Sequence, residues 1–95
     1  MAVKILIKRS VSENKTKDLI PLFQQLRMLA MNQPGYISGE TLKRIDNPGK
    51  YLVISTWNSV DNWRQWVINR QRVELQNQID ALLGEKTEYE IYEYY

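Results

Sequence analysis

The sequence contains no histidine and no cysteine among its 95 residues. The missing cysteine excludes disulfides and thiolate chemistry. The missing histidine removes the side chain that most often transfers protons near neutral pH and most often binds a metal ion. Paired carboxylates, clusters of metal ligands, nucleophile motifs and glycine-rich phosphate loops are also absent from the sequence. The usual signatures of metal, hydrolytic and nucleotide chemistry are therefore missing, and we predict no metal and no cofactor.

Long apolar runs and an excess of one charge are absent as well. No segment approaches the length of a membrane span, and residues 1–8 lack the apolar core of a signal peptide, so we expect a cytoplasmic protein without a membrane partner. The 13 basic and 11 acidic residues leave a net charge of +2, too little for the basic face of a nucleic-acid-binding protein. A hydrophobic content of 43% and a charged content of 25% are typical of a soluble folded chain. The length predicts one domain, residues 1–95.

Tryptophan, by contrast, is concentrated in one place. Trp57, Trp63 and Trp66 lie within ten positions, at the end of an expected strand and the start of an expected helix. Each is large and has one N–H that needs a partner when buried. The cluster indicates either a heavily packed core or the wall of a cavity for a flat apolar ligand.

The first half of the chain predicts a strand, a helix and a hairpin. Residues 3–9 alternate aliphatic and basic side chains, which is typical of a strand. Ser12 is a candidate N-cap for a helix that runs to Asn32, and Pro21 either kinks this helix or opens its main part after an irregular first turn. Strands are expected over 36–46 and 50–57, joined by a turn at Asn47-Pro48-Gly49.

The second half predicts a helix in two pieces and a last strand. Ser59 is expected to cap the first piece, and Gly84 to end the second. The tyrosine-rich segment 87–95 is expected to be a strand.

This order is strand, helix, strand, strand, helix, strand, which predicts an α+β protein of the ferredoxin-like βαββαβ type. We expect a four-stranded antiparallel sheet with two helices on one face and the first strand beside the last. Lys4, Lys8 and Arg9 would then face acidic residues of the last strand, namely Glu88, Glu90 and Glu93.

The face of the sheet away from the helices presents a difficulty. It carries Leu6, side chains from the segment around Val53, and several tyrosines. A small monomer should not expose such a surface. Face-to-face pairing of two sheets would bury it, so we predict a homodimer.

The chain resembles the antibiotic biosynthesis monooxygenase family of the dimeric α+β-barrel superfamily. The resemblance rests on Gln33-Pro34-Gly35-Tyr36-Ile37-Ser38-Gly39, on the segment 51–57, on Ser59 with Trp63 and Trp66, and on Tyr89-Glu90-Ile91-Tyr92. It implies a homodimer whose sheets form a shared barrel, with a cleft between the sheet and the helices of each subunit. The known activities of the family include cofactor-independent oxygenation of polycyclic phenols and oxidative haem degradation.

The sequence argues against the second of these activities. The haem-degrading members have a helix tryptophan that matches Trp66 and an iron-binding histidine about ten residues later, where this chain has Gln76. An asparagine of their first strand corresponds to Lys8. One of three functional positions is therefore kept, and without histidine or cysteine the ordinary haem ligands are missing.

Cofactor-independent oxygenation asks less of the protein, namely a dry aromatic cavity and hydrogen-bond donors for an oxyanion. The resemblance and the aromatic cluster lead us to predict a monooxygenase acting on an aromatic or polycyclic phenol with dioxygen. The predicted catalytic residues are Trp66, Asn58 and Tyr36. The predicted substrate-binding residues are Trp63, Asn62, Arg70 and Tyr92.

Plainer roles are available for most of these residues. Trp57 and Trp63 fit core packing, and Asn58 and Asn62 fit local capping at a helix start. Arg70 fits a solvated helix face. Two other functions stay open, a non-catalytic small-ligand-binding dimer and an isomerase or cyclase on the same fold.

Overall fold

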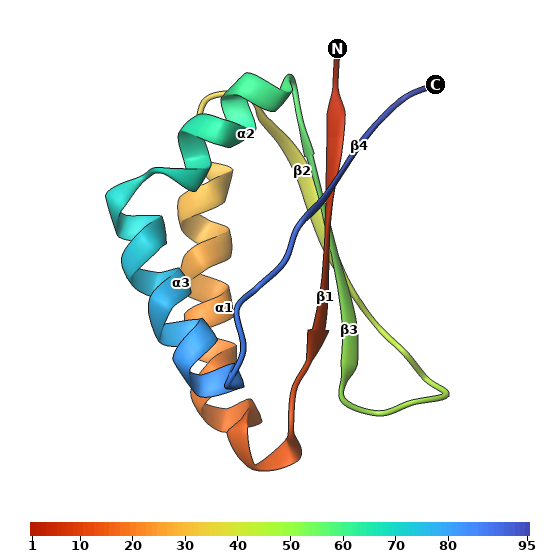
Figure 1. The fold of residues 1–95 in the computed structure, drawn as a ribbon, viewed down its shortest axis with the longest axis vertical. Coiled ribbons are helices and arrows are strands. Elements are labelled where there is room, and N and C mark those ends of the chain that lie inside the picture. Colours follow the sequence, from red (N-terminus) through yellow and green to blue (C-terminus); the bar gives the residue numbers. More distant parts are fainter.

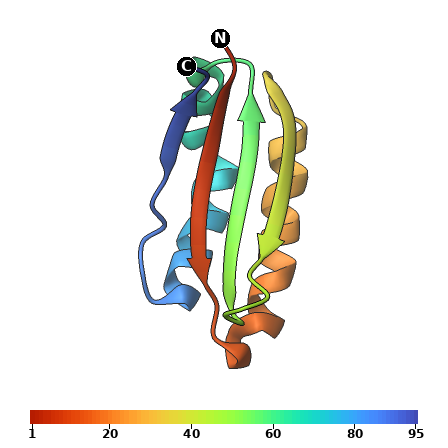
Figure 2. The same ribbon diagram turned by 90° about the vertical axis from the view of Figure 1, so that its right-hand side faces the viewer.

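The computed structural model describes residues 1–95 and consists of two layers, a sheet on one side and the helices on the other (Figure 1). The elements are β1 (Val3–Ser10), η1 (Glu13–Lys15), α1 (Thr16–Met31), β2 (Tyr36–Lys43), β3 (Lys50–Trp57), α2 (Val60–Val67), α3 (Arg70–Leu83) and β4 (Glu90–Glu93). The strands are antiparallel in the order β2-β3-β1-β4. The predicted ferredoxin-like fold is confirmed, with the first strand beside the last (Figure 2).

The first helix begins irregularly, but Pro21 does not open it, because α1 starts at Thr16. A 3-10 turn, η1, precedes α1, and Ser12 stands at its N-cap position without a side-chain capping hydrogen bond. Pro21 lies inside α1, where it cannot donate the hydrogen bond that a helical N–H normally makes to the carbonyl four residues earlier. The helix continues past it to Met31 because its apolar side of leucines and Phe23 packs against the rest of the core.

The second helical region is divided in two by its own capping residues. Ser59 caps α2 as predicted, since its Oγ accepts a hydrogen bond from the Asn62 backbone N–H at 3.1 Å. Asn69 then caps α3, its Oδ1 accepting from the Arg72 N–H at 3.0 Å. Gly84 ends α3 in the left-handed conformation, with φ of 76°.

The pairing of β1 with β4 differs from the predicted charge match. β4 pairs only with residues 3–6 of β1, and Lys4 lies opposite Tyr92 rather than a glutamate. Lys8 and Arg9 lie beyond the end of β4, so the expected ladder of opposite charges does not form. Arg9 is instead buried, on the same face of β1 as Val3 and Ile5, because side chains alternate between the two faces of a strand.

Two strands are shorter than predicted, each because of side-chain contacts next to its end. β2 ends at Lys43 rather than residue 46, where Arg44 and Asp46 form a two-bond ion pair with distances of 2.8 and 2.9 Å. β4 covers only 90–93, because Thr87 is held against α3 by hydrogen bonds to its side chain. A register irregularity in β2 separates Tyr36, opposite Trp57, from Ser38, opposite Thr56.

The core consists of two buried clusters between the sheet and the helices. One is centred on the tryptophans and the other, toward the opposite end of α1, on Leu19; their members are Val3, Ile5, Trp57, Trp63 and Trp66, and Val11, Leu19 and Ile79. None of the helices has the length and apolar character needed to cross a membrane.

Candidate active site

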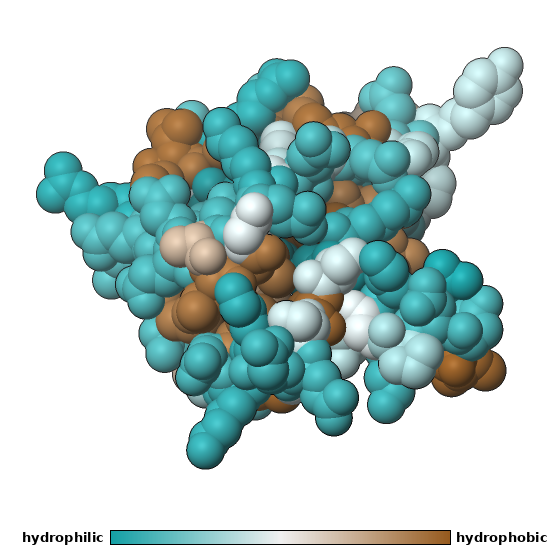
Figure 3. Space-filling view, turned by 60° about the horizontal axis from the view of Figure 1, so that its bottom comes forward, coloured by the Kyte–Doolittle hydropathy of each residue, from teal (hydrophilic) through white to brown (hydrophobic).

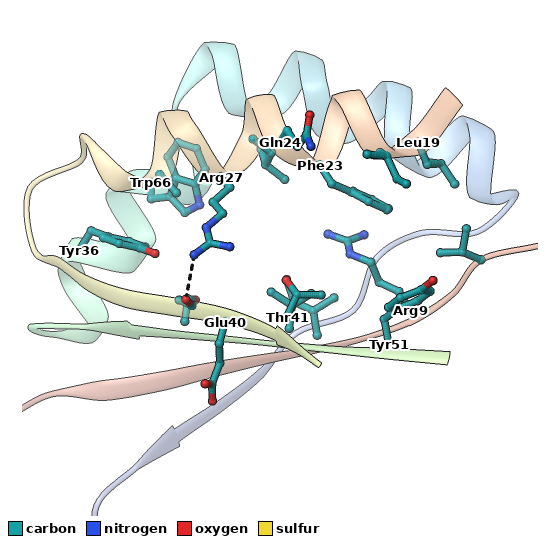
Figure 4. Close-up of a pocket in the computed structure, with 18 of the residues that line it drawn as sticks. Arg9, Leu19, Phe23, Gln24, Arg27, Tyr36, Glu40, Thr41, Tyr51 and Trp66 are labelled. Carbon is teal, nitrogen blue, oxygen red and sulfur yellow. Dashed lines mark hydrogen bonds between the residues drawn. The ribbon is translucent and has the colours of Figure 1, made fainter. Parts of the chain in front are cut away.

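A cavity of about 320 Å³ lies between α1 and the inner face of the sheet (Figure 4). Twelve of its twenty lining residues are hydrophobic, so it suits a largely apolar molecule. Both core clusters contribute to its wall. The side chains and backbone that line it come from Ile7, Arg9, Val11, Thr16, Leu19, Ile20, Phe23, Gln24, Leu26, Arg27, Ala30, Tyr36, Gly39, Glu40, Thr41, Tyr51, Val53, Ser55, Trp57 and Trp66.

One end of the cavity is an aromatic wall. The rings of Trp57 and Trp66 stack with centroids 6.2 Å apart, and Tyr36 meets Trp57 edge-on at 5.4 Å. The Trp57 indole N–H donates to Ser55 Oγ at 3.1 Å. The Trp66 indole N–H has no such partner within the chain, and no fully buried polar side-chain atom lacks one. The Trp66 N–H therefore keeps some accessible surface, and Trp66 lines the cavity.

The open side of the cavity lies between α1 and β2. Arg27 of α1 reaches across it and donates from Nη2 to the Gly39 carbonyl at 3.3 Å. Thr41 lines the same side from β2. Glu40 contributes to the wall through its position in β2, but its side chain points to the other face of the sheet (Figure 4). No carboxylate side chain therefore points into the cavity.

The other end of the cavity contains Arg9. Its side chain is 6% exposed and its guanidinium lies over the Phe23 ring, 4.7 Å from the centroid. Its one hydrogen bond runs from Nη1 to Thr87 Oγ1 at 3.4 Å. Burial lowers the pKa of the Arg9 guanidinium from its usual value, opposed by Tyr89 and Asp80 nearby. The guanidinium stays charged because arginine is not deprotonated in proteins.

A buried polar network stands behind Arg9, between α3 and the segment that leads to β4. Arg72 donates to the Tyr89 hydroxyl, which donates to Gln76 Oε1 at 3.2 Å. Gln76 and the Thr87 hydroxyl both donate to Asp80 Oδ1, at 2.9 and 2.6 Å. Burial raises the pKa of the Tyr89 hydroxyl, so it is neutral at physiological pH. Gln76, where the sequence resemblance led us to look for an iron-binding histidine, therefore belongs to this internal network.

Two of the seven predicted site residues, Trp66 and Tyr36, line the cavity. The other five lie outside its wall, for reasons that differ from one to the next.

Asn58 is exposed, and its backbone N–H donates to the Gly35 carbonyl at 2.7 Å. The Asn62 side chain accepts from Ser59 Oγ at 2.8 Å. Trp63 packs edge-on against Tyr89, with ring centroids 5.6 Å apart.

The remaining two predicted residues lie on the surface. Arg70 is exposed at the start of α3. Tyr92 is 50% exposed and lies opposite Lys4 on the outer face of the sheet. The roles predicted for these residues stay predictions.

The sequence analysis missed several cavity residues. One of them, Arg9, could have been found from the alternation of side chains along its strand. It follows Val3, Ile5 and Ile7 in alternation, so it belongs to the buried face of β1. A charged side chain on an apolar face indicates a functional or paired group. Arg27 and Thr41 had no such signal, because polar side chains at those positions of a helix and an edge strand are ordinary.

No group of three or more acidic side chains gathers closely enough to hold a metal ion. The fold and the cavity together define a small ferredoxin-like α+β protein with an aromatic, apolar cavity between its sheet and its first helix. Residues 2–78 match the family model of the antibiotic biosynthesis monooxygenases, and the chain belongs to this family.

Solved structures show the same fold along the whole chain. A conserved protein from Methanosarcina mazei superposes with a TM-score of 0.91 at 19% identity, covering 100% of this chain and 94% of that one. SnoaB, a cofactor-independent oxygenase from Streptomyces nogalater, superposes with a TM-score of 0.82 at 16% identity, covering 99% of this chain and 93% of that one. Rv0793 from Mycobacterium tuberculosis gives 0.87 at 12% identity, with coverage of 100% and 96%. No curated protein sequence matches the chain.

Proposed function

We propose that the protein is a cofactor-independent monooxygenase that oxidises a phenolic aromatic molecule in the cavity between α1 and the sheet. The observation that supports this most directly is the apolar cavity with the unpaired Trp66 indole N–H in its wall. Its volume of about 320 Å³ is within the usual range of small-molecule sites. The family membership and the fold shared with an oxygenase point in the same direction.

The proposed chemistry needs only the substrate, dioxygen and a suitable environment. The phenol loses its proton, and the phenolate passes one electron to dioxygen. The resulting radical and superoxide combine at a ring carbon to give a peroxide anion, which takes up one proton, replacing the one that the phenol lost, to become a hydroperoxide. Loss of water then leaves a quinone, so one oxygen atom enters the product and the other leaves in water. The apolar wall excludes bulk water from these charged intermediates and strengthens each hydrogen bond made to them.

Two residues have proposed roles in this reaction. The Trp66 N–H donates to the peroxide oxygen, where negative charge develops. The Tyr36 hydroxyl, on the same part of the wall, transfers a proton during loss of water. The flat ring of the substrate lies against the aromatic wall that Trp57 and Trp66 form.

Replacing Trp66 with phenylalanine keeps most of the ring surface and removes the N–H. Loss of a hydrogen bond to a charged group costs about 1.5–3 kcal/mol, so kcat/KM should fall roughly 10- to 100-fold. Oxygen consumption with a panel of hydroxylated polycyclic aromatics measures this.

The same change at Trp63 provides the comparison, because that ring contacts Tyr89 rather than the cavity. Its kcat/KM should be little changed. An equal loss at both positions would support the binding role predicted for Trp63 from the sequence. Unchanged turnover after Trp66→Phe would remove the proposed donor.

A non-catalytic ligand-binding protein is the second candidate. It is favoured by the small number of polar catalytic groups at the cavity, since Asn58 and Asn62 lie elsewhere. The two functions differ in one measurable respect. A binding protein would take up aromatic phenols, with a change in tryptophan fluorescence, and would consume no oxygen with any of them.

We also propose that two copies pair through the outer face of the sheet, which faces the viewer in Figure 2. The outward side chains of the two central strands include Leu6, Leu52 and Ile54, all only partly buried. Leu42 and Tyr92 extend this face and are 48% and 50% exposed. Removing such an apolar surface from water stabilises an assembly by about 25 cal/mol per Å².

Sedimentation at micromolar concentration should therefore show a dimer. Leu52→Lys places a charge at the centre of the outer face and should produce monomers. Ile45→Lys is the matched control, because Ile45 is also exposed, at 94%, but lies in the β2–β3 turn. A monomeric native protein, or equal dissociation by both changes, would contradict the proposed interface.

A further inference from the structure

The Arg9 end of the cavity carries a positive charge without an ionic partner. The two ion pairs of the structure, Arg44–Asp46 and Arg64–Asp61, both lie on the surface. The guanidinium of Arg9 makes one long hydrogen bond to a neutral hydroxyl, that of Thr87. Burying a charge without a counter-ion is costly, so this position is unusual for a side chain with only a packing role.

The neighbouring network does not neutralise this charge. It contains a second buried guanidinium, that of Arg72, and one carboxylate, that of Asp80. Asp80 accepts its hydrogen bonds from Gln76 and Thr87, and neither arginine bonds to it. Two positive groups therefore share one nearby negative group, and a net positive charge remains at this end of the cavity.

The remaining donors of Arg9 are directed toward the cavity. No fully buried polar side-chain atom lacks a hydrogen-bond partner, so the guanidinium nitrogens without one retain accessible surface. Figure 4 shows the guanidinium rising from β1 into the space beneath α1, beside Phe23. It faces the same cavity as the aromatic wall, at the opposite end from Tyr36.

The other charged residues of the cavity lining also favour a negatively charged ligand. Arg27 adds a second guanidinium at the open side, and the carboxylate of Glu40 points away. Seen from the end of the molecule where α1 begins, hydrophilic side chains surround hydrophobic ones that lie deeper (Figure 3). A ligand that matches this cavity has an apolar aromatic body and one negative end.

We propose that the cavity binds its aromatic ligand as an oxyanion, with a carboxylate or phenolate oxygen on the Arg9 guanidinium. This rests on the proposed function only in placing the ligand in the same cavity. A planar guanidinium can hold a carboxylate through two parallel hydrogen bonds or a phenolate through one. Because the interaction takes place away from water, it is stronger than the same pair at the surface.

The test compares the binding of three probes under anaerobic conditions, by tryptophan fluorescence and calorimetry. 2-Naphthoate carries the negative charge, 2-naphthamide is its neutral counterpart of similar size, and 2-naphthol can ionise. The native protein should bind 2-naphthoate about tenfold or more tightly than 2-naphthamide. In Arg9→Met this preference should disappear, whereas Arg9→Lys should retain part of it.

Arg64→Met is the control for net charge. Its side chain is 64% exposed on α2, away from the cavity, so the preference for 2-naphthoate should stay. Circular dichroism establishes that each variant is folded. If Arg9→Met does not fold, Arg9→Lys takes its place, and an unchanged preference for 2-naphthoate in that variant would overturn the assignment to Arg9.

The third probe separates the two possible oxyanions. If Arg9 accepts a phenolate, bound 2-naphthol should show naphtholate absorption at a lower pH than free 2-naphthol does, and Arg9→Met should abolish this shift. Binding of 2-naphthoate without such a shift assigns the site to carboxylates. The chain has no histidine or cysteine, so a transition near neutral pH reports the ligand rather than a protein side chain.

Equal affinity for 2-naphthoate and 2-naphthamide, or no binding of 2-naphthoate, would overturn the proposal. So would an equal loss of both probes in a folded Arg9→Met variant. Oxyanion binding without oxygen consumption by any phenol would retain the Arg9 site and reject the oxygenase. Oxygen consumption by a protein that does not prefer the anion would reject the Arg9 site alone.

Discussion

Trp57→Ala should destabilise the protein by about 3–5 kcal/mol, the usual cost of emptying a buried aromatic site. Trp57 is 1% exposed, and its ring contacts both Trp66 and Tyr36. The loss approaches the total stability of a small domain, about 5–15 kcal/mol. Each kcal/mol lowers Tm by about 4–8 °C at this size, so the effect should be evident in thermal and urea unfolding followed by circular dichroism.

A second substitution separates packing from hydrogen bonding at this site. Trp57→Phe keeps an aromatic ring but loses the N–H bond to Ser55, and should cost less than the alanine change. Tyr94→Ala is the control, because Tyr94 is 60% exposed and its loss should be nearly neutral. A Trp57→Ala protein as stable as the Tyr94→Ala protein would show that the tryptophan cluster is not the centre of the core.

Loss of the Trp57 ring should also affect the cavity. Trp66 and Tyr36 line the cavity, and each is packed against Trp57. A folded Trp57→Ala protein should therefore bind aromatic probes more weakly even at low temperature, because its aromatic wall has lost the ring that holds the other two. Fluorescence titration with 2-naphthoate measures this in the same preparations.

Gly35→Ala should be the second severe change, at about 2–5 kcal/mol. Gly35 has φ of +85°, and an added Cβ would lie 2.3 Å from Asn62 Cγ. The left-handed backbone costs other residues about 1–2 kcal/mol, and forcing atoms into a filled space adds about 1–3 kcal/mol. Asn62 cannot easily move aside, because its side chain and backbone both bond to Ser59 at the start of α2.

Gly84→Ala is the matched control for this prediction. Gly84 has a similar φ of +76°, but nothing lies within 4 Å of its added Cβ. It should show only the backbone cost of about 1–2 kcal/mol. Urea unfolding gives the loss of stability for each change, and the difference between the two losses is the cost of the contact with Asn62. Asn62→Ala in the Gly35→Ala protein should recover part of it, and equal costs at both glycines would refute the steric argument.

The fold could be predicted because local signals agreed with one another. Alternation in residues 3–9, the cap at Ser59, the turn at 47–49 and the stop at Gly84 each act over a few residues and together permit one order of elements. The limits of β2 and β4 could not be predicted in the same way. They depend on the Arg44–Asp46 pair and on the contacts of Thr87 with α3, and the latter contacts are distant in sequence.

The site was less predictable because the same residue types can cap a helix or line a binding cavity. Asn58 and Asn62 follow a strand and begin a helix, where a polar side chain suits either a cap or a ligand, and in Asn62 the cap accounts for its contacts. Arg9 was grouped with Lys4 and Lys8 in a charge match with the last strand, although its position in the alternation placed it inside. Arg27 reaches the cavity through the side-by-side packing of α1 and β2, which no local pattern specifies.

The irregularity near the start of β2 accommodates one extra residue while Tyr36 stays on the cavity face. Tyr36 and Thr41 both line the cavity although they are an odd number of residues apart, which regular alternation forbids. Ile37 has no partner on β3 and is the extra residue that shifts the alternation of side chains by one position. Deleting this one residue would leave Tyr36 and Thr41 four residues apart, so regular alternation alone would keep the Tyr36 hydroxyl on the cavity face. Among relatives of this fold, the chain could therefore be one residue shorter here while the cavity keeps the same groups in its wall.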